Sequence, residues 1–433
     1  MTPSSATNGQ RISFFGLGAM GGGMASNLAR RGFHVTGYDL SSAMVDSLVA
    51  AGGHSAPSPA LAASAACGRF AVVMVATMYQ ADSVLFDKDG AAASLPRDSI
   101  LLLCSTCPPS YPPLLRKRLD DVGRSDVKLL DCPVSGGTLR AAAGELSIFA
   151  SGDADALHEA GALLNAMAKN LYLVPGGVSM GQKVKAVHQL LAATNIISAS
   201  EAMGLAATVG LDTQAVFDSV SKGPGASFML SNRGPHMLVP DQTVRSAVAI
   251  IFKDAGIVVD AARAIRHPVP LAAAAEQLYA MASAPPRDLL AADDARLVEM
   301  YLPPADRELV ARLRGAEGRR GRSDVVSAQT VADLLAGIHL AASVEAMAYC
   351  KALEVERKLM CEIVSEAAGW CAMFTDHVPA MLDHDQWTLA RCSGADAVRR
   401  RLELAVDACR TIGYPCQMGV TALHQYKFAA LVE

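Results

Sequence analysis

A glycine-rich turn near the start of the chain constrains its fold more than any other feature. An apolar run, RISFFG at 11–16, leads directly into GLGAMGGGMASNLARRG, which has a helical pattern. Gly16, Gly18 and Gly21 have the spacing G-x-G-x-x-G between this run and the helix. The first glycine permits a tight turn, the second lets the backbone approach a pyrophosphate, and the third allows the helix to pack closely on the strand. With a second apolar run, FHVTGYD at 33–39, the segment has the outline of a βαβ unit with parallel strands.

The same unit predicts a binding site for NAD. Ala19 and Met20 complete the turn, and the helix that follows offers unpaired N–H donors to phosphates. Asp39 lies at the end of the second strand, about 20 residues after the turn, where a carboxylate can accept hydrogen bonds from ribose hydroxyls and would repel a 2′-phosphate. The pattern therefore favours NAD over NADP. The alternative is that the glycines form only a turn and Asp39 only caps a helix.

The order of the remaining segments predicts two kinds of domain. Apolar runs at 70–76, 99–104 and 128–131 alternate with helical or loop segments, which is typical of a doubly wound, mostly parallel sheet of the Rossmann type. From about Lys183 the chain is rich in Ala, Leu and Met and has few strand signals, so we expect it to be helical. A stretch rich in Pro, Arg and Gly interrupts this helical half. The expected domains are α/β at 1–182, all-α at 183–302, a linker at 303–327, and a second all-α domain at 328–433.

The second all-α domain is predicted to be a copy of the first. QLLAATNIISASEAMGLAATVGLD, from Gln189, aligns without gaps with DLLAGIHLAASVEAMAYCKALEVE, from Asp333, at an offset of 144 residues. Two unrelated alanine-rich segments would not reproduce glycine and proline positions at one spacing. The pairs at this offset, and at a slightly larger one further on, include Leu190/Leu334, Glu201/Glu345, Met203/Met347, Gly225/Gly369, Pro235/Pro379 and Asp260/Asp407.

Composition and charge exclude several classes of partner. The chain has 38 basic and 42 acidic side chains, a formal net charge of -4 and no concentrated basic stretch, so nucleic acid is not expected as a partner. Its ten cysteines are scattered singly, so we expect reduced thiols and no metal site. The polar start carries no apolar signal segment, and no later run reaches the roughly 20 uncharged apolar residues of a membrane span. We therefore expect a cytoplasmic protein without a membrane partner.

Three ordered motifs resemble those of the β-hydroxyacid dehydrogenases, a family that includes 3-hydroxyisobutyrate, tartronate semialdehyde, L-threonate and 6-phosphogluconate enzymes. They are the glycine-rich turn, DCPVSGGTLRAAAGELSIFASGD at 131–153, and GVSMGQKVKAVHQLL at 177–191. The resemblance runs from about residue 11 to 302. It implies a Rossmann domain, helical domains like those of 6-phosphogluconate dehydrogenase, and NAD-dependent oxidation of a small hydroxycarboxylic acid.

The resemblance also implies which residues bind the ligands. Ser135, Gly136 and Gly137 correspond to a carboxylate-binding turn, and such a turn can hold an anion because it exposes successive N–H groups beside a hydroxyl. A plain loop is the alternative. The positions that correspond to cofactor-facing ones in the family are Thr106, near the nicotinamide, and Thr77 and Met78, in another loop.

Lys185 is the expected catalytic residue. When a hydroxyl is oxidised, a proton must leave as hydride departs from the same carbon, so a base within hydrogen-bond reach lowers the barrier. Most lysines are solvated surface residues, but Lys185 stands in the KxxHQ frame of the family's catalytic segment. Lys183, two residues earlier, leaves an alternative alignment. A Lys185 side chain that pointed into bulk water would exclude this role.

Three further residues are expected to contact the substrate. Gln189 lies one helical turn after Lys185, on the same face, where many family members carry Asn. Lys253, in the KD pair of IFKDAG, is expected to support substrate or nicotinamide binding, with a surface salt bridge as the alternative. Arg140 fits a polyhydroxylated acid, with a surface position as the alternative. His188 is expected to serve in packing or on the cofactor side.

The second helical copy lacks this chemistry. The positions equivalent to Lys185, Gln189 and Lys253 carry other residues, namely Gln329, Asp333 and Arg400. Family enzymes commonly associate through their helical domains. We therefore expect the two copies to pack around a local two-fold axis as an internal pseudo-dimer, with a homodimer as a further possibility.

The details of the motifs look most like the L-threonate 2-dehydrogenase branch of the family, so an L-threonate-like sugar acid is the expected substrate. The alternative enzyme activities are 3-hydroxyisobutyrate dehydrogenase and tartronate semialdehyde reductase. A different alternative is a non-catalytic dinucleotide-binding interaction protein, since some proteins of this fold have lost the lysine. The presence of Lys185 argues against it.

Overall fold

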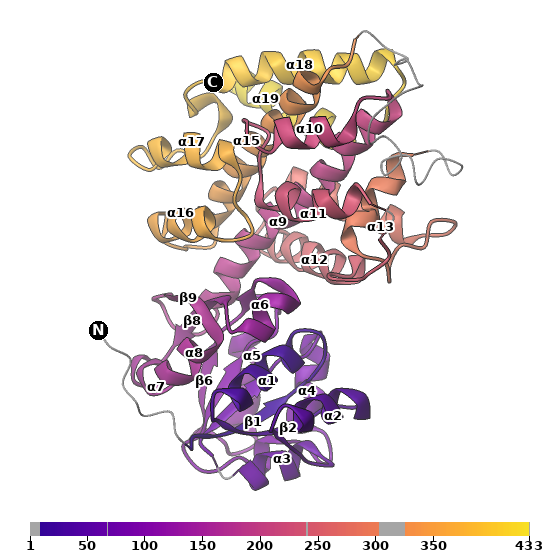
Figure 1. The fold of residues 1–433 in the computed structure, drawn as a ribbon. Coiled ribbons are helices and arrows are strands. Elements are labelled where there is room, and N and C mark those ends of the chain that lie inside the picture. Colours follow the sequence, from indigo (N-terminus) through magenta and orange to yellow (C-terminus); the bar gives the residue numbers. More distant parts are fainter. Residues whose placement is uncertain (1–8, 67, 240, 303–324, 433) are drawn as a thin grey trace. The chain divides into compact units, whose positions relative to one another are not determined.

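The chain folds into two compact units, Met1–Lys185 and Ala186–Glu433 (Figure 1). The structure is a computed structural model that describes residues 9–66, 68–239, 241–302 and 325–432. Of the predicted linker, residues 303–324 lie outside the described residues.

In the described part of the first unit, nine strands form a doubly wound sheet. Its strands follow the order β3-β2-β1-β4-β5-β6-β8-β7, with β9 beside β8; the pairings from β3 to β6 are parallel, and β8 is antiparallel to β6. The strands are β1 (Arg11–Phe15), β2 (His34–Tyr38), β3 (His54–Ser55), β4 (Phe70–Val73), β5 (Ile100–Leu103), β6 (Lys128–Asp131), β7 (Val134–Ser135), β8 (Leu146–Gly152) and β9 (Ala168–Leu173). The helices are α1 (Gly21–Arg30), α2 (Ser42–Ala50), α3 (Pro59–Ala66), α4 (Met78–Phe86), α5 (Tyr111–Asp121), α6 (Gly137–Ala143), α7 (Ala154–Glu159) and α8 (Gly161–Met167).

The central strands are apolar throughout because both faces of the sheet are covered. Successive side chains of a strand point to opposite faces. On β5, Leu102 therefore joins the cluster that contains Leu28 of α1, whereas Leu101 and Leu103 join the cluster that contains Leu115 of α5. The predicted strand at 128–131 has the predicted bounds, and those at 70–76 and 99–104 are shorter, since the chain leaves the sheet after Val73 and Leu103.

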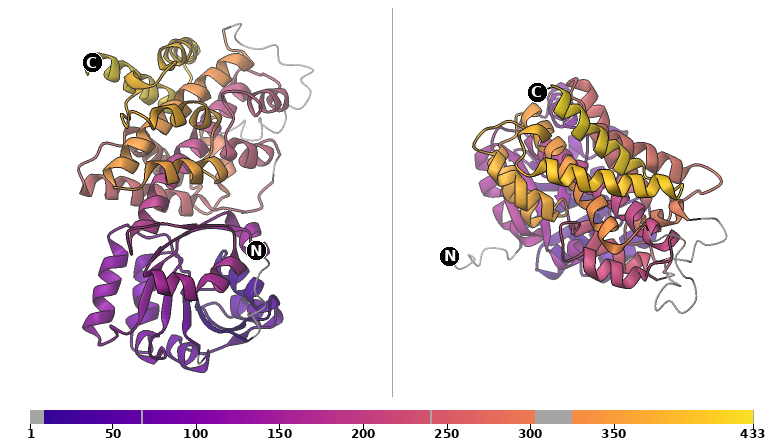
Figure 2. Two further views of the ribbon diagram at one scale, coloured as in Figure 1. Left: turned by 90° about the vertical axis from the view of Figure 1, so that its left-hand side faces the viewer. Right: turned by 90° about the horizontal axis from the view of Figure 1, so that it is seen from above.

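The second unit is all-α among its described residues (Figure 2). In chain order, its helices fall into two similar series. The long helix that opens the first series also spans the boundary between the units. The first series is α9 (Met180–Thr208), α10 (Thr213–Val220), α11 (Phe228–Met237), α12 (Val248–Ala264) and α13 (Pro270–Ser283), followed by the 3-10 segment η2 (Asp294–Tyr301). The second series is α15 (Ala328–Ala352), α16 (Arg357–Glu366), α17 (Ala372–Met381), α18 (Ala395–Thr411) and α19 (Gln417–Val432), with η4 (Leu389–Arg391) before α18. The predicted fold class, a Rossmann sheet followed by helical domains, is confirmed.

The two helical series meet at a short antiparallel bridge. Ser227 pairs with Cys371, which stands at the equivalent position, 144 residues later. The N–H of Phe228 donates to the carbonyl of Trp370 at 2.9 Å, and the N–H of Ala372 donates to the carbonyl of Ala226 at 2.9 Å. A residue that pairs with its own counterpart lies on a two-fold axis, because each copy then offers the same surface to the other.

Two buried glutamates make a second pair of reciprocal contacts. Glu201 of α9 accepts hydrogen bonds from the N–H groups of Met418 at 2.9 Å and Gly419 at 3.1 Å, in the first turn of α19. Its counterpart in α15, Glu345, accepts from the N–H groups of Leu271 at 2.9 Å and Ala272 at 3.0 Å, in the first turn of α13. Each carboxylate thus caps a helix of the other copy. These contacts are those that the predicted internal pseudo-dimer requires.

Among the residues that the structure describes, two helices, α9 and α15, are long and apolar enough to cross a membrane by composition alone. All of the most apolar 18-residue window of α9 and 83% of that of α15 are buried inside the protein. Both are therefore core helices, around which the two helical series are built.

Candidate active site

The glycine-rich turn has the geometry that its spacing predicts. Gly16 follows β1 with a φ of 92°, in the left-handed region that favours glycine. A Cβ atom on Gly21 would lie 2.0 Å from the carbonyl oxygen of Gly16, so the start of α1 packs directly on the turn. A Cβ atom on Gly18 would have no neighbour within 4 Å, which leaves the backbone there open to a ligand. The N-cap residue of α1, Met20, makes no side-chain capping bond, so the helix N-terminus keeps donors for an anion.

Replacing Gly21 with alanine is expected to disrupt the turn, because the new methyl group would overlap the Gly16 carbonyl. We expect a stability loss of about 1–3 kcal/mol and no dinucleotide binding. The control is Gly18→Ala, which has open space around its Cβ and should fold normally while binding the dinucleotide more weakly. Thermal unfolding and the quenching of protein fluorescence by NAD measure the two effects. Equal stability of the two variants would contradict the assigned roles.

Asp39 joins the end of β2 to the glycine-rich turn. Its Oδ2 accepts a hydrogen bond from the N–H of Leu17 at 2.6 Å, and its Oδ1 accepts one from the N–H of Ser41 at 2.8 Å. Each carboxylate oxygen has a second lone pair, so both can still accept a bond from a ribose hydroxyl. The side chain is half-buried rather than turned into solvent.

Thr77 has a structural role at the start of α4. Its hydroxyl accepts a hydrogen bond from the N–H of Gln80 at 3.2 Å, and the Gln80 side chain accepts one from the N–H of Thr77 at 3.2 Å. This reciprocal pair is a capping box, which stabilises the first turn of a helix. It holds the loop that also carries Met78, the first residue of α4.

Thr106 is held by a side chain that the sequence analysis did not single out. Gln182, in the first turn of α9, accepts a hydrogen bond from the N–H of Cys107 at 3.0 Å and donates one to the carbonyl of Ser105 at 2.9 Å. The amide thus bonds to the backbone on both sides of Thr106. The sequence feature that could have identified Gln182 is its position in the third motif, three residues before Lys185.

A buried carboxylate fixes the same helix end to β6. Asp131 accepts hydrogen bonds from the N–H of Gln182 at 2.9 Å and from its side-chain amide at 3.0 Å. Burial raises the pKa of Asp131 to about 7. A Cβ atom on Gly181 would lie 2.4 Å from the carbonyl oxygen of Phe149, so α9 begins in direct contact with the sheet. The first turn of α9 is therefore rigidly attached to the ends of β5 and β6.

The predicted anion turn lies at the end of β7, a few residues after Asp131 ends β6. Ser135 ends β7 and is 8% exposed, and Gly136 and Gly137 have φ values of 143° and 76°. Gly136 caps α6 without a side-chain hydrogen bond. Arg140 lies one turn into α6 and is half-buried. These residues combine positive φ, a hydroxyl and a helix start, which are the features of an anion-binding turn.

Lys185 lies on the next turn of α9 after Gln182 and is 5% exposed. The side chain does not point into bulk water, so the condition that would have excluded its catalytic role is not met. Lys183, the alternative in the alignment, is more exposed.

Gln189 and the KD pair come together within the second unit. The side-chain amide of Gln189 donates to Oδ2 of Asp254 at 2.5 Å, and Lys253 forms an ion pair with Oδ1 of Asp254 at 3.0 Å. The side-chain oxygen Oε1 of Gln189 lies 3.0 Å from Nδ1 of His188. Asp254 is 4% exposed and the side chain of Lys253 is 26% exposed, so the ion pair is partly buried. His188 also accepts a hydrogen bond from the N–H of Gly369 at 3.1 Å, which gives it a packing role between the helical copies.

The equivalent positions of the second copy carry ordinary surface pairs. Gln329 donates to Asp333 at 2.9 Å in an exposed position, and Arg400 pairs with Asp396 at 2.7 Å with both side chains more than 60% exposed. The second copy thus keeps the packing positions and not the chemical ones. Over the described ranges, no group of three or more His, Cys, Asp or Glu side chains could hold a metal ion.

Two family models match the chain. The NAD binding domain of 6-phosphogluconate dehydrogenase matches residues 11–176. The model described as NAD-binding of NADP-dependent 3-hydroxyisobutyrate dehydrogenase matches residues 179–301 and 327–432, which are the two helical series.

Several known proteins are similar to this chain. L-threonate dehydrogenase of Cupriavidus necator is 40% identical over 274 residues, which cover 63% of this chain and 91% of that protein. L-threonate dehydrogenase of Escherichia coli strain K12 is 34% identical over 272 residues, covering 63% and 89%. A crystal structure of 3-hydroxyisobutyrate dehydrogenase from Salmonella typhimurium has a TM-score of 0.61 at 34% identity and covers 67% of this chain and all of that one. The 6-phosphogluconate dehydrogenase of Plasmodium falciparum covers 96% of this chain with a TM-score of 0.69, but its 13% identity relates the fold alone.

A dinucleotide-binding sheet that passes into helical domains, with a glycine-rich turn after its first strand, defines an NAD(P)-dependent dehydrogenase. The relatives and both family models narrow this class to enzymes that act on hydroxyacids. The chain belongs to the β-hydroxyacid dehydrogenase family.

Proposed function

We propose that this protein oxidises L-threonate, or a closely similar sugar acid, with NAD as the hydride acceptor. The observation that carries the proposal is the buried Lys185 on a helix whose first turn is bonded to the ends of β5 and β6. The names of the relatives support the choice of substrate, since several are L-threonate dehydrogenases at 32–40% identity. A cytoplasmic location is part of the same proposal.

The residues of the first unit fit a dinucleotide. The open backbone at Gly18 and the N-terminus of α1 would hold the pyrophosphate, and Asp39 would hold the adenosine ribose. Thr106 would lie near the nicotinamide, and Thr77 and Met78 would face the cofactor from another loop. When bound, NAD supplies the carbon that accepts the hydride.

The protein's own residues then bind the substrate and move the proton. In this proposal Ser135, Gly136 and Gly137 hold the carboxylate, with Arg140 available to additional hydroxyls. The amine of Lys185 takes the hydroxyl proton during oxidation and returns it during reduction, which is general base and general acid catalysis in the two directions. The substrate contacts on the helical side are Gln189 and Lys253, both oriented through Asp254.

A substrate panel tests the proposal. Nicotinamide absorbance is followed with L-threonate, D-erythronate, D-glycerate, 3-hydroxyisobutyrate and L-serine, each with NAD and with NADP. We expect the highest kcat/KM with L-threonate and NAD. A higher value with 3-hydroxyisobutyrate or D-glycerate would replace the substrate assignment, and no turnover with any compound would favour a binding protein.

Replacing Asp39 with serine is expected to weaken the preference for NAD. The carboxylate would repel a 2′-phosphate, so its removal should raise the KM for NAD and lower the ratio of NAD to NADP activity at least tenfold, an effect of about 1.4 kcal/mol. The control is Asp46→Ser, which removes a negative charge from the exposed surface of the neighbouring helix α2. A ratio that changes equally in both variants would contradict a specific role for Asp39.

A further inference from the structure

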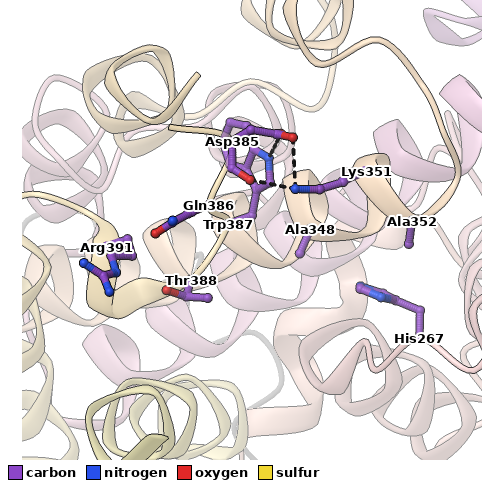
Figure 3. A pocket seen from close by; sticks show the side chains of 9 residues that line it. All are labelled: His267, Ala348, Lys351, Ala352, Asp385, Gln386, Trp387, Thr388 and Arg391. Carbon is purple, nitrogen blue, oxygen red and sulfur yellow. Dashed lines mark hydrogen bonds and ion pairs between the residues drawn. The ribbon is translucent and has the colours of Figure 1, made fainter. Parts of the chain in front are cut away.

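A cavity of about 460 Å³ lies in the second unit, and none of its lining residues belongs to the candidate active site (Figure 3). The lining comes from His267, from the last turns of α15, and from the segment 385–391. Its size falls within the range of sites that bind small molecules. The residues contributed by α15 are Ala348, Lys351 and Ala352.

The local two-fold axis between the two helical series accounts for the position of this cavity. In the first helical series, Tyr301 of η2 fills the corresponding position: it packs on Gly204 and its ring stacks on Tyr414, with centroids 6.0 Å apart. The counterpart of Gly204, 144 residues later, is Ala348, and the counterpart of Tyr414, 147 residues earlier, is His267. Ala348 and His267 both line the cavity. The cavity is therefore the symmetry mate of a position where this protein buries a phenol ring.

Two cationic side chains and one carboxylate line the cavity. Asp385 is already bound by several donors: Nε1 of Trp387 at 2.8 Å, Nζ of Lys351 at 2.9 Å and the guanidinium of Arg357 at 3.1 Å. Figure 3 shows Asp385, Lys351 and Trp387 together on one side of the cavity, with Arg391 and His267 on other sides. The lining thus has two cations, Lys351 and Arg391, against one carboxylate.

His267 adds a neutral aromatic surface to this lining. Burial lowers the pKa of the imidazole, which favours its neutral form, and its ring stacks on Tyr349 with centroids 5.8 Å apart. An imidazole, the buried Trp387 and two alanines offer apolar surface to a ring, while the cations attract an anion.

We propose that this cavity binds a small aromatic carboxylate, separately from the dehydrogenase site. The ring lies against His267 and Ala348, as the ring of Tyr301 lies against their counterparts. The carboxylate lies toward Lys351 and Arg391. Tyr301 fills this position in the first helical series, and a ligand fills its counterpart in the second.

The test uses 3-(4-hydroxyphenyl)propionate, which joins the ring of a tyrosine to a carboxylate, and the full chain in isothermal titration calorimetry. We expect saturable binding at one site. The same compound without the carboxylate, 4-ethylphenol, and propionate without the ring should bind at least tenfold more weakly. No saturable binding of the probe, or equal binding of the three compounds, would overturn the proposal.

Variants locate the bound probe. Ala352→Phe fills the cavity from an exposed lining position and is expected to abolish binding, and Lys351→Met is expected to weaken it at least fivefold. The matched control, Lys427→Met, removes an exposed cation of the same copy outside the cavity and should bind normally. Circular dichroism melts verify that each variant is folded. Unchanged binding in Ala352→Phe would overturn the proposal.

The dehydrogenase site also takes carboxylates, so competition separates the two sites. Lys185→Met should bind the probe as the parent protein does, and saturating NAD with L-threonate should not displace it. Displacement would assign the probe to the dehydrogenase site and overturn the inference, whereas the proposed dehydrogenase function would be unaffected.

Discussion

Replacing Lys185 with methionine is expected to lower kcat by about 10²–10⁴-fold and to leave dinucleotide binding unchanged. This is the range that a positioned general acid or base contributes. Methionine keeps the length and apolar stem of the side chain and removes only the amine, which suits a residue that is 5% exposed. Stopped-flow or steady-state assays of nicotinamide absorbance measure kcat, and fluorescence quenching measures the affinity for NAD.

Lys183→Met is the matched control. Lys183 lies two residues earlier on α9 and is the other lysine that the alignment allowed. The Lys183→Met variant should retain nearly full activity, because residues two apart on a helix face different directions. A larger loss in Lys183→Met than in Lys185→Met would move the catalytic role to Lys183. Unchanged turnover in both variants would remove the lysine mechanism.

Replacing Glu345 with alanine is expected to lower the free energy of unfolding by about 2–6 kcal/mol. The change leaves the buried N–H groups of Leu271 and Ala272 without their acceptor, and each unsatisfied donor costs roughly 1–3 kcal/mol. Because Glu201 makes the same contacts with α19, Glu201→Ala should have an effect of similar size. Urea unfolding followed by circular dichroism measures both.

The control for these variants is Glu362→Ala, which removes an exposed glutamate of α16. Its stability should stay within about 0.5 kcal/mol of the parent, as is usual for surface changes. If Glu345→Ala were no less stable than Glu362→Ala, the reciprocal caps would not hold the two helical copies together.

The same two glutamates make stability depend on pH. Burial raises the pKa of both Glu201 and Glu345 from 4.5 to about 7. Between pH 4.5 and pH 7 the folded protein keeps protons on these two carboxyls that the unfolded protein has lost. Their contribution to the free energy of unfolding is therefore complete below pH 4.5 and is lost as the pH rises through 7. Each carboxyl is expected to contribute about 3 kcal/mol to this change.

The double variant Glu201→Gln, Glu345→Gln isolates this contribution. His339 acts in the opposite direction, because burial lowers its pKa to about 3 and stability falls as the pH drops below 6.5. His339 is present in both proteins, so the difference between parent and double variant cancels it. We expect the parent to lose more stability than the double variant between pH 5 and pH 8; parallel pH profiles would contradict the assignment.

Most of the fold could be predicted from the sequence because its signals are local. The strand at 128–131, the turn from Gly16 to Gly21 and the duplication all rest on spacings within one segment or between two similar ones. The strand ends at Val73 and Leu103 were missed by one to three residues, since an apolar residue after a strand continues the pattern without continuing the hydrogen bonds.

The candidate site was predicted only in part, because some of its side chains act through distant partners. Gln182 bonds to Cys107, 75 residues away, and Asp131 bonds to the start of α9, 51 residues away. No local sequence pattern around a glutamine in a helix or an aspartate after a strand predicts these bonds. The resemblance to the family pointed to Lys185 and Gln189, and the structure added Asp254 as the hydrogen-bond partner of Gln189.

The order of elements, the glycines of the dinucleotide turn and the existence of a second helical copy were determined by the sequence alone, since each depends on short-range periodicity or on a repeated spacing. Only the tertiary structure shows that Glu201 and Glu345 each cap a helix of the other copy. It alone also shows that a cavity lies beside Ala348, whereas Tyr301 packs on the equivalent residue, Gly204. The physical reason is that a buried donor, acceptor or ring is satisfied by whatever lies next to it in space, and that neighbour comes from a part of the chain that no local pattern identifies.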